Sequence, residues 1–98
     1  MTQTEVLKKA IEYYGDANQL NMIKEELAEL IVAISHYERG RIGADEVLEE
    51  VADNGIVINQ LLLMLENESL DSCKIDDILY RNINKKMKRL EKRILTKE

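Results

Sequence analysis

The chain has 98 residues, enough for one helical domain but close to the size at which association with another copy completes the core. It has no proline, tryptophan or phenylalanine, and 34% of its residues are charged, a composition that favours packed helices over a sheet. The net charge of −5 argues against a broad nucleic-acid surface, and one cysteine with one histidine argues against zinc and rules out an intrachain disulfide.

Apolar segments in the chain are too short to cross a bilayer, as Leu61–Leu65 illustrates. We also find no charged start followed by an apolar run and a cleavage site, the pattern of a secretion signal. The sequence therefore predicts a soluble, cytoplasmic protein that binds neither membranes nor nucleic acid.

Two helices are expected in the first half of the chain. Apolar spacing predicts a first helix over Thr4–Tyr14, which Gly15-Asp16 interrupts. Asp16 is the expected N-cap of a second helix, about 23 residues long, that ends at the turn Arg39–Gly43. Because Leu30–Ile34 is apolar on every side, more than one neighbour should surround it. The predicted core stripe of the second helix is Leu20, Ile23, Leu27, Leu30, Ile34 and Tyr37.

A third helix is predicted over Ala44–Glu66. The β-branched residues Ile56–Ile58 would also suit a strand, but no period-two alternation follows them, so a helix is favoured. The segment Ile56–Leu65 has almost no polar face and is the best candidate for an intersubunit surface. The densest apolar side of this helix is Val47, Val51, Ile58, Leu61, Leu62 and Leu65.

A polar segment, Asn67–Ser72, precedes a last amphipathic helix. Its apolar positions are Ile75, Ile78, Leu79, Ile83, Met87, Leu90 and Ile94. No internal repeat or linker is present. The predicted fold is all-α: a four-helix bundle forming a single domain over residues 1–98 and completed by oligomerisation.

Two acidic clusters interrupt otherwise apolar helices, and they carry most of the functional information. In each cluster two acids lie three residues apart on one side of a helix, Glu26 with Glu29 and Glu50 with Asp53. If the helices pack antiparallel, Glu26 and Asp53 become neighbours, and four facing carboxylates should resist folding unless a cation binds. Oxygen ligands favour Mg²⁺ or Mn²⁺. The clusters are Glu25-Glu26-Leu27-Ala28-Glu29 and Glu49-Glu50-Val51-Ala52-Asp53.

Four polar residues, most of them cationic, recur along the last predicted helix at three- and four-residue spacing. We call them the cationic stripe: Asn82, Lys86, Arg89 and Arg93. Lysine and arginine are the usual partners of phosphate oxygens, so this stripe is a candidate phosphate site with Asn82 as a candidate nucleotide contact. Basic residues near a helix C-terminus also complement the helix dipole, and acidic strings are often solvated helix faces.

The order of these motifs resembles the MazG-like, all-α nucleoside triphosphate pyrophosphohydrolases, a superfamily that also contains the dimeric dUTPases. The family pattern, E-E-x-x-E followed by E-x-x-D, reads here as Glu25–Glu29 and Glu50–Asp53, and the basic last helix follows. The resemblance covers roughly residues 19–94 and is greatest to the phage-like, single-domain members. The chain lacks the additional helices of dimeric dUTPases, so a broader pool-cleaning or pool-balancing activity is expected.

The resemblance implies Mg²⁺-dependent hydrolysis of a (deoxy)nucleoside triphosphate to the monophosphate and pyrophosphate by a MazG-like bundle assembled as a dimer or tetramer. It assigns Glu25 to the attacking water, and Lys86 and Arg89 to the leaving pyrophosphate. The metal ligands that it implies are Glu26, Glu29, Glu50 and Asp53.

Two other functions stay open from the sequence. One is a helical interaction or regulatory module, in which the acids are surface charge and Ile56–Leu65 is a docking face. The other is a degenerate family member that binds a nucleotide without hydrolysing it. Base specificity does not follow from the sequence, because it depends on side chains from several helices.

Overall fold

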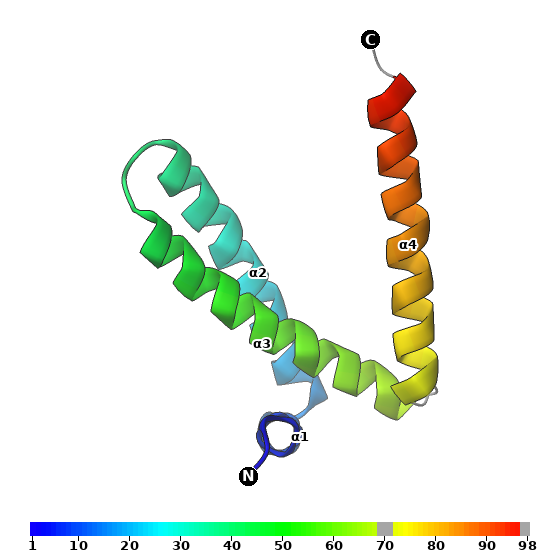
Figure 1. The fold of residues 1–98 in the computed structure, drawn as a ribbon. Helices are drawn as coiled ribbons and strands as arrows, with labels where there is room; N and C mark the ends of the chain where they lie inside the picture. The colour runs from blue at the N-terminus through cyan, green and yellow to red at the C-terminus, as the bar shows by residue number, and fades with distance from the viewer. Residues whose placement is uncertain (69–71, 97–98) are drawn as a thin grey trace. The chain divides into compact units, whose positions relative to one another are not determined.

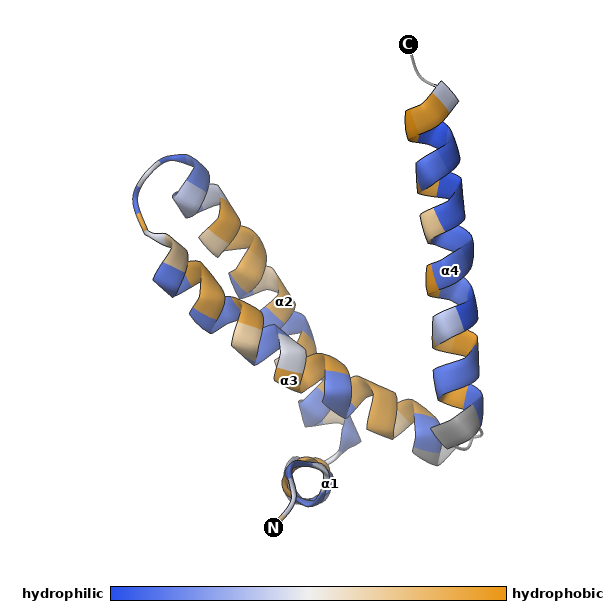
Figure 2. Ribbon diagram, viewed as in Figure 1, coloured by the Kyte–Doolittle hydropathy of each residue, from blue (hydrophilic) through white to orange (hydrophobic). Residues whose placement is uncertain are grey.

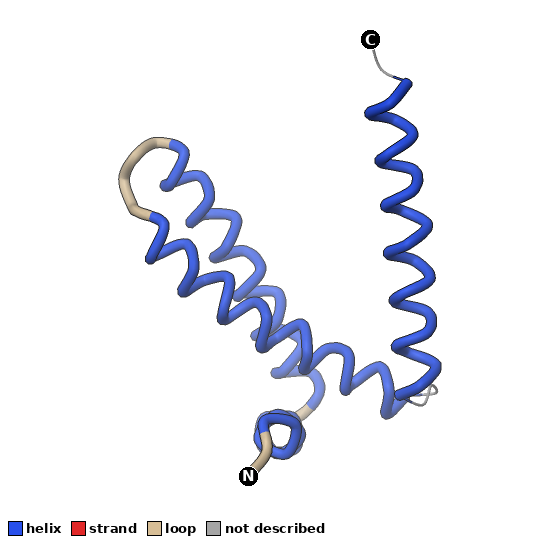
Figure 3. The backbone as a smooth tube through the Cα atoms, viewed as in Figure 1, coloured by secondary structure: helices blue, strands red, loops and turns tan. Residues whose placement is uncertain are grey.

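The computed structural model describes the backbone of residues 1–68 and 72–96 and the side chains of residues 1–66 and 74–96. The described chain forms four helices and contains no strand (Figures 1 and 3), so the predicted all-α class is confirmed, including a helix at Ile56–Ile58. The helices are α1 (Gln3–Tyr14), α2 (Asp16–Glu38), α3 (Ala44–Glu68) and α4 (Ser72–Thr96).

The chain divides into two compact units. The first, Met1–Met64, contains α1, α2 and most of α3, and the second, Leu65–Glu98, contains the end of α3 and α4. A single domain and a complete four-helix bundle therefore stay predictions. Helix α3 runs two residues beyond its predicted end, and residues 69–71 of the predicted polar segment lie outside the described residues. In the described ranges, no helix combines the length and hydropathy needed to cross a membrane.

The start of α1 is fixed by a capping box that the sequence analysis did not identify. The Glu5 backbone N–H donates to Thr2 Oγ1 at 3.1 Å, and the Thr2 backbone N–H donates to Glu5 Oε1 at 2.8 Å. The hydrogen bond from the Thr2 backbone lowers the pKa of Glu5, because it stabilises the carboxylate form. As a result α1 begins at Gln3, one residue before the predicted start.

The junctions on either side of α2 depend on two glycines. Gly15 has φ 83° and ψ 155°, a conformation open essentially only to glycine, and it occupies the N-cap position of α2. The predicted N-cap Asp16 is wrong, because Asp16 already lies inside the helix. At the other end Gly40, with φ 71°, closes a Schellman motif in which Arg41 N–H donates to the carbonyl of His36. The predicted end of α2 at this turn is confirmed.

Helices α2 and α3 lie side by side and antiparallel (Figure 1). Their inward residues recur in alternating steps of three and four, the spacing of a coiled coil, and we call this contact the seam. Ile11 of α1 joins Ile23, Val57 and Met64 in the buried core cluster. The seam residues are Gln19, Ile23, Glu26, Leu30 and Ala33 on α2, and Val47, Glu50, Asn54, Val57, Leu61 and Met64 on α3, all buried or half-buried.

The predicted core stripes are only partly correct. Of the α2 stripe, Ile23 is buried and Leu30 half-buried, and on α3 Val47, Leu61 and Leu62 are half-buried. Apolar residues are frequent along both helices (Figure 2), and they lie on exposed sides as well as in the seam, so hydropathy alone does not select the face that meets the partner helix. The predicted core positions that are exposed are Leu20, Leu27, Ile34, Tyr37, Val51, Ile58 and Leu65.

Polar residues mark the face that forms the seam. Gln19 Nε2 donates to Gln60 Oε1 at 2.7 Å, and both side chains are buried. Such a buried pair costs less free energy when both partners face each other than in any arrangement that separates them. The pair thus favours the observed orientation over one that buries the outer apolar residues between the two helices.

Candidate metal-binding site

Three carboxylates from two helices converge in the seam. Glu26 and Glu29 of α2 and Glu50 of α3 each offer one oxygen, and these three oxygens lie within 4.8 Å of one another. The three-residue spacing puts the first two on one side of α2, and the antiparallel register brings Glu50 opposite them. Glu26 and Glu50 are half-buried, whereas Glu29 is exposed. We call this group the carboxylate cluster.

Two further predicted site residues lie at the edge of the carboxylate cluster. Asp53 is not one of the three converging residues, but its charge acts on both Glu26 and Glu50. Glu25 is exposed, and its charge acts on Glu26. The antiparallel packing thus brings the two sequence motifs together.

The electrostatics of the carboxylate cluster disfavour its fully charged form. Desolvation is the largest cause that raises the pKa of Glu26, followed by the charges of Glu29, Asp53, Glu50 and Glu25. The pKa of Glu50 is raised first by desolvation and then by neighbouring carboxylates. Without a cation, each ionised group is held among like charges.

Two oxygens of the carboxylate cluster are buried and have no hydrogen-bond partner, Glu26 Oε2 and Glu50 Oε2. A buried acceptor without a donor is costly, and a carboxylate oxygen more so than a neutral one. A hard divalent cation would satisfy both oxygens and also offset the mutual repulsion. The donor set, oxygen atoms only, therefore fits Mg²⁺ or Mn²⁺.

Asn54 is a polar residue of the site that the sequence analysis missed. Its Nδ2 donates to the backbone carbonyl of Glu26 at 3.0 Å and to that of Glu50 at 2.7 Å. The signal was available in its position, because Asn54 lies four residues after Glu50 and three before Val57, on the seam spacing. A polar residue on such a spacing indicates a hydrogen bond across the helix pair.

An open groove of about 330 Å³ adjoins the carboxylate cluster on the side of the α2–α3 loop. Apolar side chains form part of its wall, and glutamates form much of the rest. The groove is lined by Glu29, Val32, Ala33, His36, Ile42, Glu46, Glu49 and Glu50. The cluster is thus reachable from solvent, as a site that exchanges a ligand requires.

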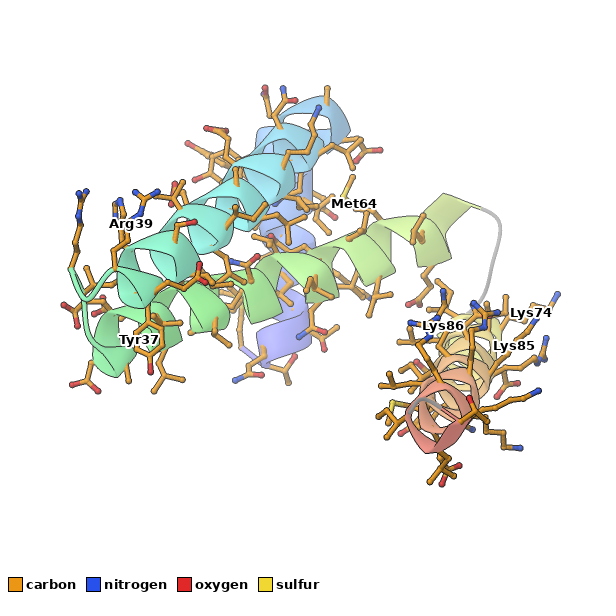
Figure 4. All side chains as sticks on the ribbon, turned by 90° about the horizontal axis from the view of Figure 1, so that it is seen from above. Tyr37, Arg39, Met64, Lys74, Lys85 and Lys86 are labelled. Carbon is orange, nitrogen blue, oxygen red and sulfur yellow. The ribbon has the colours of Figure 1, made fainter. Side chains whose placement is uncertain are left out.

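The predicted cationic stripe lies on α4, within the second unit (Figure 4). Helical backbone is continuous through Asn82–Arg93, so the three- and four-residue spacing places these residues along one side. All four side chains, Asn82, Lys86, Arg89 and Arg93, are exposed. Their meeting with the carboxylate cluster stays a prediction.

Comparison with protein-family models, with curated proteins and with solved structures gives no match. The likeness to MazG-like pyrophosphohydrolases therefore stays an expectation from the motif residues.

Proposed function

We propose that the protein is a Mg²⁺-dependent nucleoside triphosphate pyrophosphohydrolase, which converts a (deoxy)nucleoside triphosphate to the monophosphate and pyrophosphate in the cytoplasm. The observation that supports this most strongly is the carboxylate cluster, whose oxygens Glu26 Oε2 and Glu50 Oε2 are buried without a hydrogen-bond donor. The order of the acidic motifs supports the reaction class. Mn²⁺ would substitute for Mg²⁺, since both accept oxygen ligands.

In this proposal the carboxylate cluster, together with Asp53, holds the metal. The bound ion would neutralise phosphate charge and lower the pKa of a coordinated water. Glu25, exposed next to Glu26, would orient the attacking water and accept its proton.

We propose that the cationic stripe of α4 binds the phosphates of the substrate. Lys86, Arg89 and Arg93 would bind the pyrophosphate part of the substrate, and Asn82 would contact the nucleotide. Their charges would balance those phosphate oxygens that the metal does not contact.

Substituting Arg89 with alanine should raise the KM for the nucleoside triphosphate about tenfold or more, because a charge-assisted hydrogen bond to phosphate is lost. Steady-state kinetics of pyrophosphate release measure this. Lys88→Ala is the matched control, since Lys88 is also exposed on α4 but points about 100° or more away from the stripe. An equal effect of the two substitutions would mean that α4 contributes only general positive charge.

The reaction itself is tested by pyrophosphate release from a panel of canonical and damaged nucleoside triphosphates with Mg²⁺ or Mn²⁺. Selective release would identify the substrate class and separate pool cleaning from pool balancing. If folded protein releases no pyrophosphate from any of them, the proposed activity is wrong.

We further propose that the protein is a homo-oligomer, a dimer or tetramer, because large apolar side chains of the first unit remain exposed in the single chain. Ile31 is 67% exposed and Ile56 51% exposed, on the outer faces of α2 and α3. Their burial against another copy would be favourable in proportion to the apolar area covered. Other exposed apolar side chains of α2 and α3 are Leu27, Val32, Ile34, Leu48, Val51 and Ile58.

A glutamate at position 58 should weaken this association. Burying an unpaired carboxylate is costly, so Ile58→Glu should raise the dissociation constant about 100-fold or more. Sedimentation equilibrium measures the effect. Asn59→Glu introduces the same charge at the next, polar and exposed position and should leave the assembly intact. A monomeric wild-type protein would contradict the proposal outright.

The exposed apolar residues of Ile56–Leu65, such as Ile56 and Ile58, also suit the second candidate function, a helical interaction module that docks on a different protein. In that case the carboxylate cluster would be surface charge, and millimolar Mg²⁺ would not raise the melting temperature. A third outcome, stabilisation by a nucleotide without turnover, would identify a degenerate, nucleotide-binding member of the resembled family.

A further inference from the structure

Asn54 occupies an unusual place in the seam. Its side chain is 3% exposed, and its Nδ2 spans the two helices by donating to the carbonyl oxygens of Glu26 and Glu50. Both acceptors belong to residues of the carboxylate cluster, one on each helix. A single amide therefore connects the backbones that carry the opposing carboxylates.

The cost of this arrangement is also visible. Asn54 Oδ1 is buried and has no hydrogen-bond partner. An aliphatic residue at this position would pack in the seam without that penalty. Stable packing of α2 against α3 therefore does not require an asparagine at position 54. An asparagine is explained if it controls the distance between the two helices next to a cluster of like charges.

We propose that Asn54 is a positioning residue of the metal site: its amide fixes the distance between the α2 and α3 backbones at the carboxylate cluster. This inference rests on the proposed metal-dependent function. Repulsion among Glu26, Glu29 and Glu50 pushes the two helices apart when no cation is bound. The hydrogen bond from Asn54 of α3 to the Glu26 carbonyl of α2 opposes that movement, and the bond to the Glu50 carbonyl, within α3, holds the amide in place. The ligands are thus preorganised before the metal arrives.

The test measures binding of Mn²⁺ alone, by electron paramagnetic resonance or calorimetry, to wild-type protein and to Asn54→Leu. The Kd for Mn²⁺ should rise about 10- to 100-fold in the variant, the range found when a group that orients metal ligands is removed. The midpoint of urea unfolding without metal should stay equal or rise. A purely structural role predicts instead that affinity and metal-free stability fall together.

Asn54→Ala covers the case in which leucine is too large for the seam. Leucine and alanine change the side-chain volume in opposite directions, so a shared loss of Mn²⁺ affinity marks the missing amide. The matched control is the double variant Gln19→Leu/Gln60→Leu, which removes the other polar contact across the seam. It should bind Mn²⁺ within about twofold of the wild type, because that pair lies roughly 9 Å further along α3.

The possible outcomes distinguish three claims: the positioning role of Asn54, the metal site and the hydrolase activity. Unchanged Mn²⁺ affinity in both Asn54 variants, with a wild type that binds Mn²⁺, overturns the role of Asn54 and leaves the metal site intact. An equal loss in the Gln19/Gln60 control also overturns it. A wild type that binds no Mn²⁺ refutes the metal site and Asn54 together, whereas Mn²⁺ binding without pyrophosphate release refutes only the hydrolase.

Discussion

Replacing Glu26 with glutamine should lower kcat/KM for pyrophosphate release about a thousandfold or more. The substitution keeps the size of a half-buried side chain but removes one of three converging negative charges, and with it a ligand of the proposed metal ion. Initial rates at saturating Mg²⁺, with the substrate found in the panel, measure the loss. Glu12→Gln, an exposed glutamate of α1, is the control and should retain wild-type activity.

The other acidic positions make the same experiment more specific. Glu29→Gln and Glu50→Gln should be as damaging as Glu26→Gln, since all three oxygens lie within 4.8 Å of one another. Asp53→Asn distinguishes a site with four protein ligands from one with three. Asp53 lies outside the converging group but its charge acts on two of its members, so a loss as large as that of Glu26→Gln would indicate a fourth ligand and a small loss would indicate three. Wild-type activity in Glu26→Gln would refute the assignment of this residue.

Without divalent cations, Glu26→Gln should be more stable than the wild type at pH 7.5, and this advantage should disappear near pH 4.5. The pKa values of Glu26 and Glu50 are raised above their ordinary value of 4.5, chiefly by desolvation. Between the ordinary and the raised pKa the folded state binds more protons than the unfolded state. The contribution of these groups to stability is therefore complete below about pH 4.5 and is lost as the pH rises through the raised values.

Mg²⁺ should reverse this order at neutral pH. Binding only to the folded state at ten times its Kd stabilises a protein by about 1.4 kcal/mol, which is about 6 °C in melting temperature for a domain of this size. Thermal unfolding at pH 7.5, once with EDTA and once with Mg²⁺, measures the melting temperature of each protein without and with the ion. The wild type should gain several degrees from Mg²⁺, and Glu26→Gln should gain almost nothing.

Two results would contradict this account. A wild type that is less stable than Glu26→Gln at pH 4.5 by the same margin as at pH 7.5 would mean that the difference does not arise from ionisation. An equal gain from Mg²⁺ in both proteins would mean that the ion binds elsewhere. Glu12→Gln again serves as the control, since it removes the same charge from an exposed position.

The sequence was sufficient where local chemistry determines the structure. The helix end at Gly40 follows from glycine's tolerance of positive φ, and the close approach of the two acidic motifs follows from a short loop between two antiparallel helices. The capping box at Thr2 and Glu5 was equally readable from its spacing but was overlooked.

The sequence was insufficient where several faces of a helix compete. Leu27 and Ile34 are as apolar as the residues that α2 buries, yet the structure exposes them. The choice of face depends on hydrogen bonds between residues far apart in the chain, such as Gln19 with Gln60, and hydropathy periodicity contains no information about such pairs. For Asn54 the position on the seam spacing was readable from the sequence, but its partners were not, since they are backbone carbonyls rather than side chains.

The five-residue connection Arg39–Gly43 limits which insertions and deletions this chain can tolerate during evolution. Its length sets the register of α3 against α2, and a slip of one residue moves a side chain about 1.5 Å along the axis and 100° around it. Such a slip would separate Glu29 from Glu50 without removing any acidic residue. If the proposed metal site is correct, insertions and deletions in this loop, usually among the most permissive mutations, should be selected against as strongly as the loss of a proposed metal ligand.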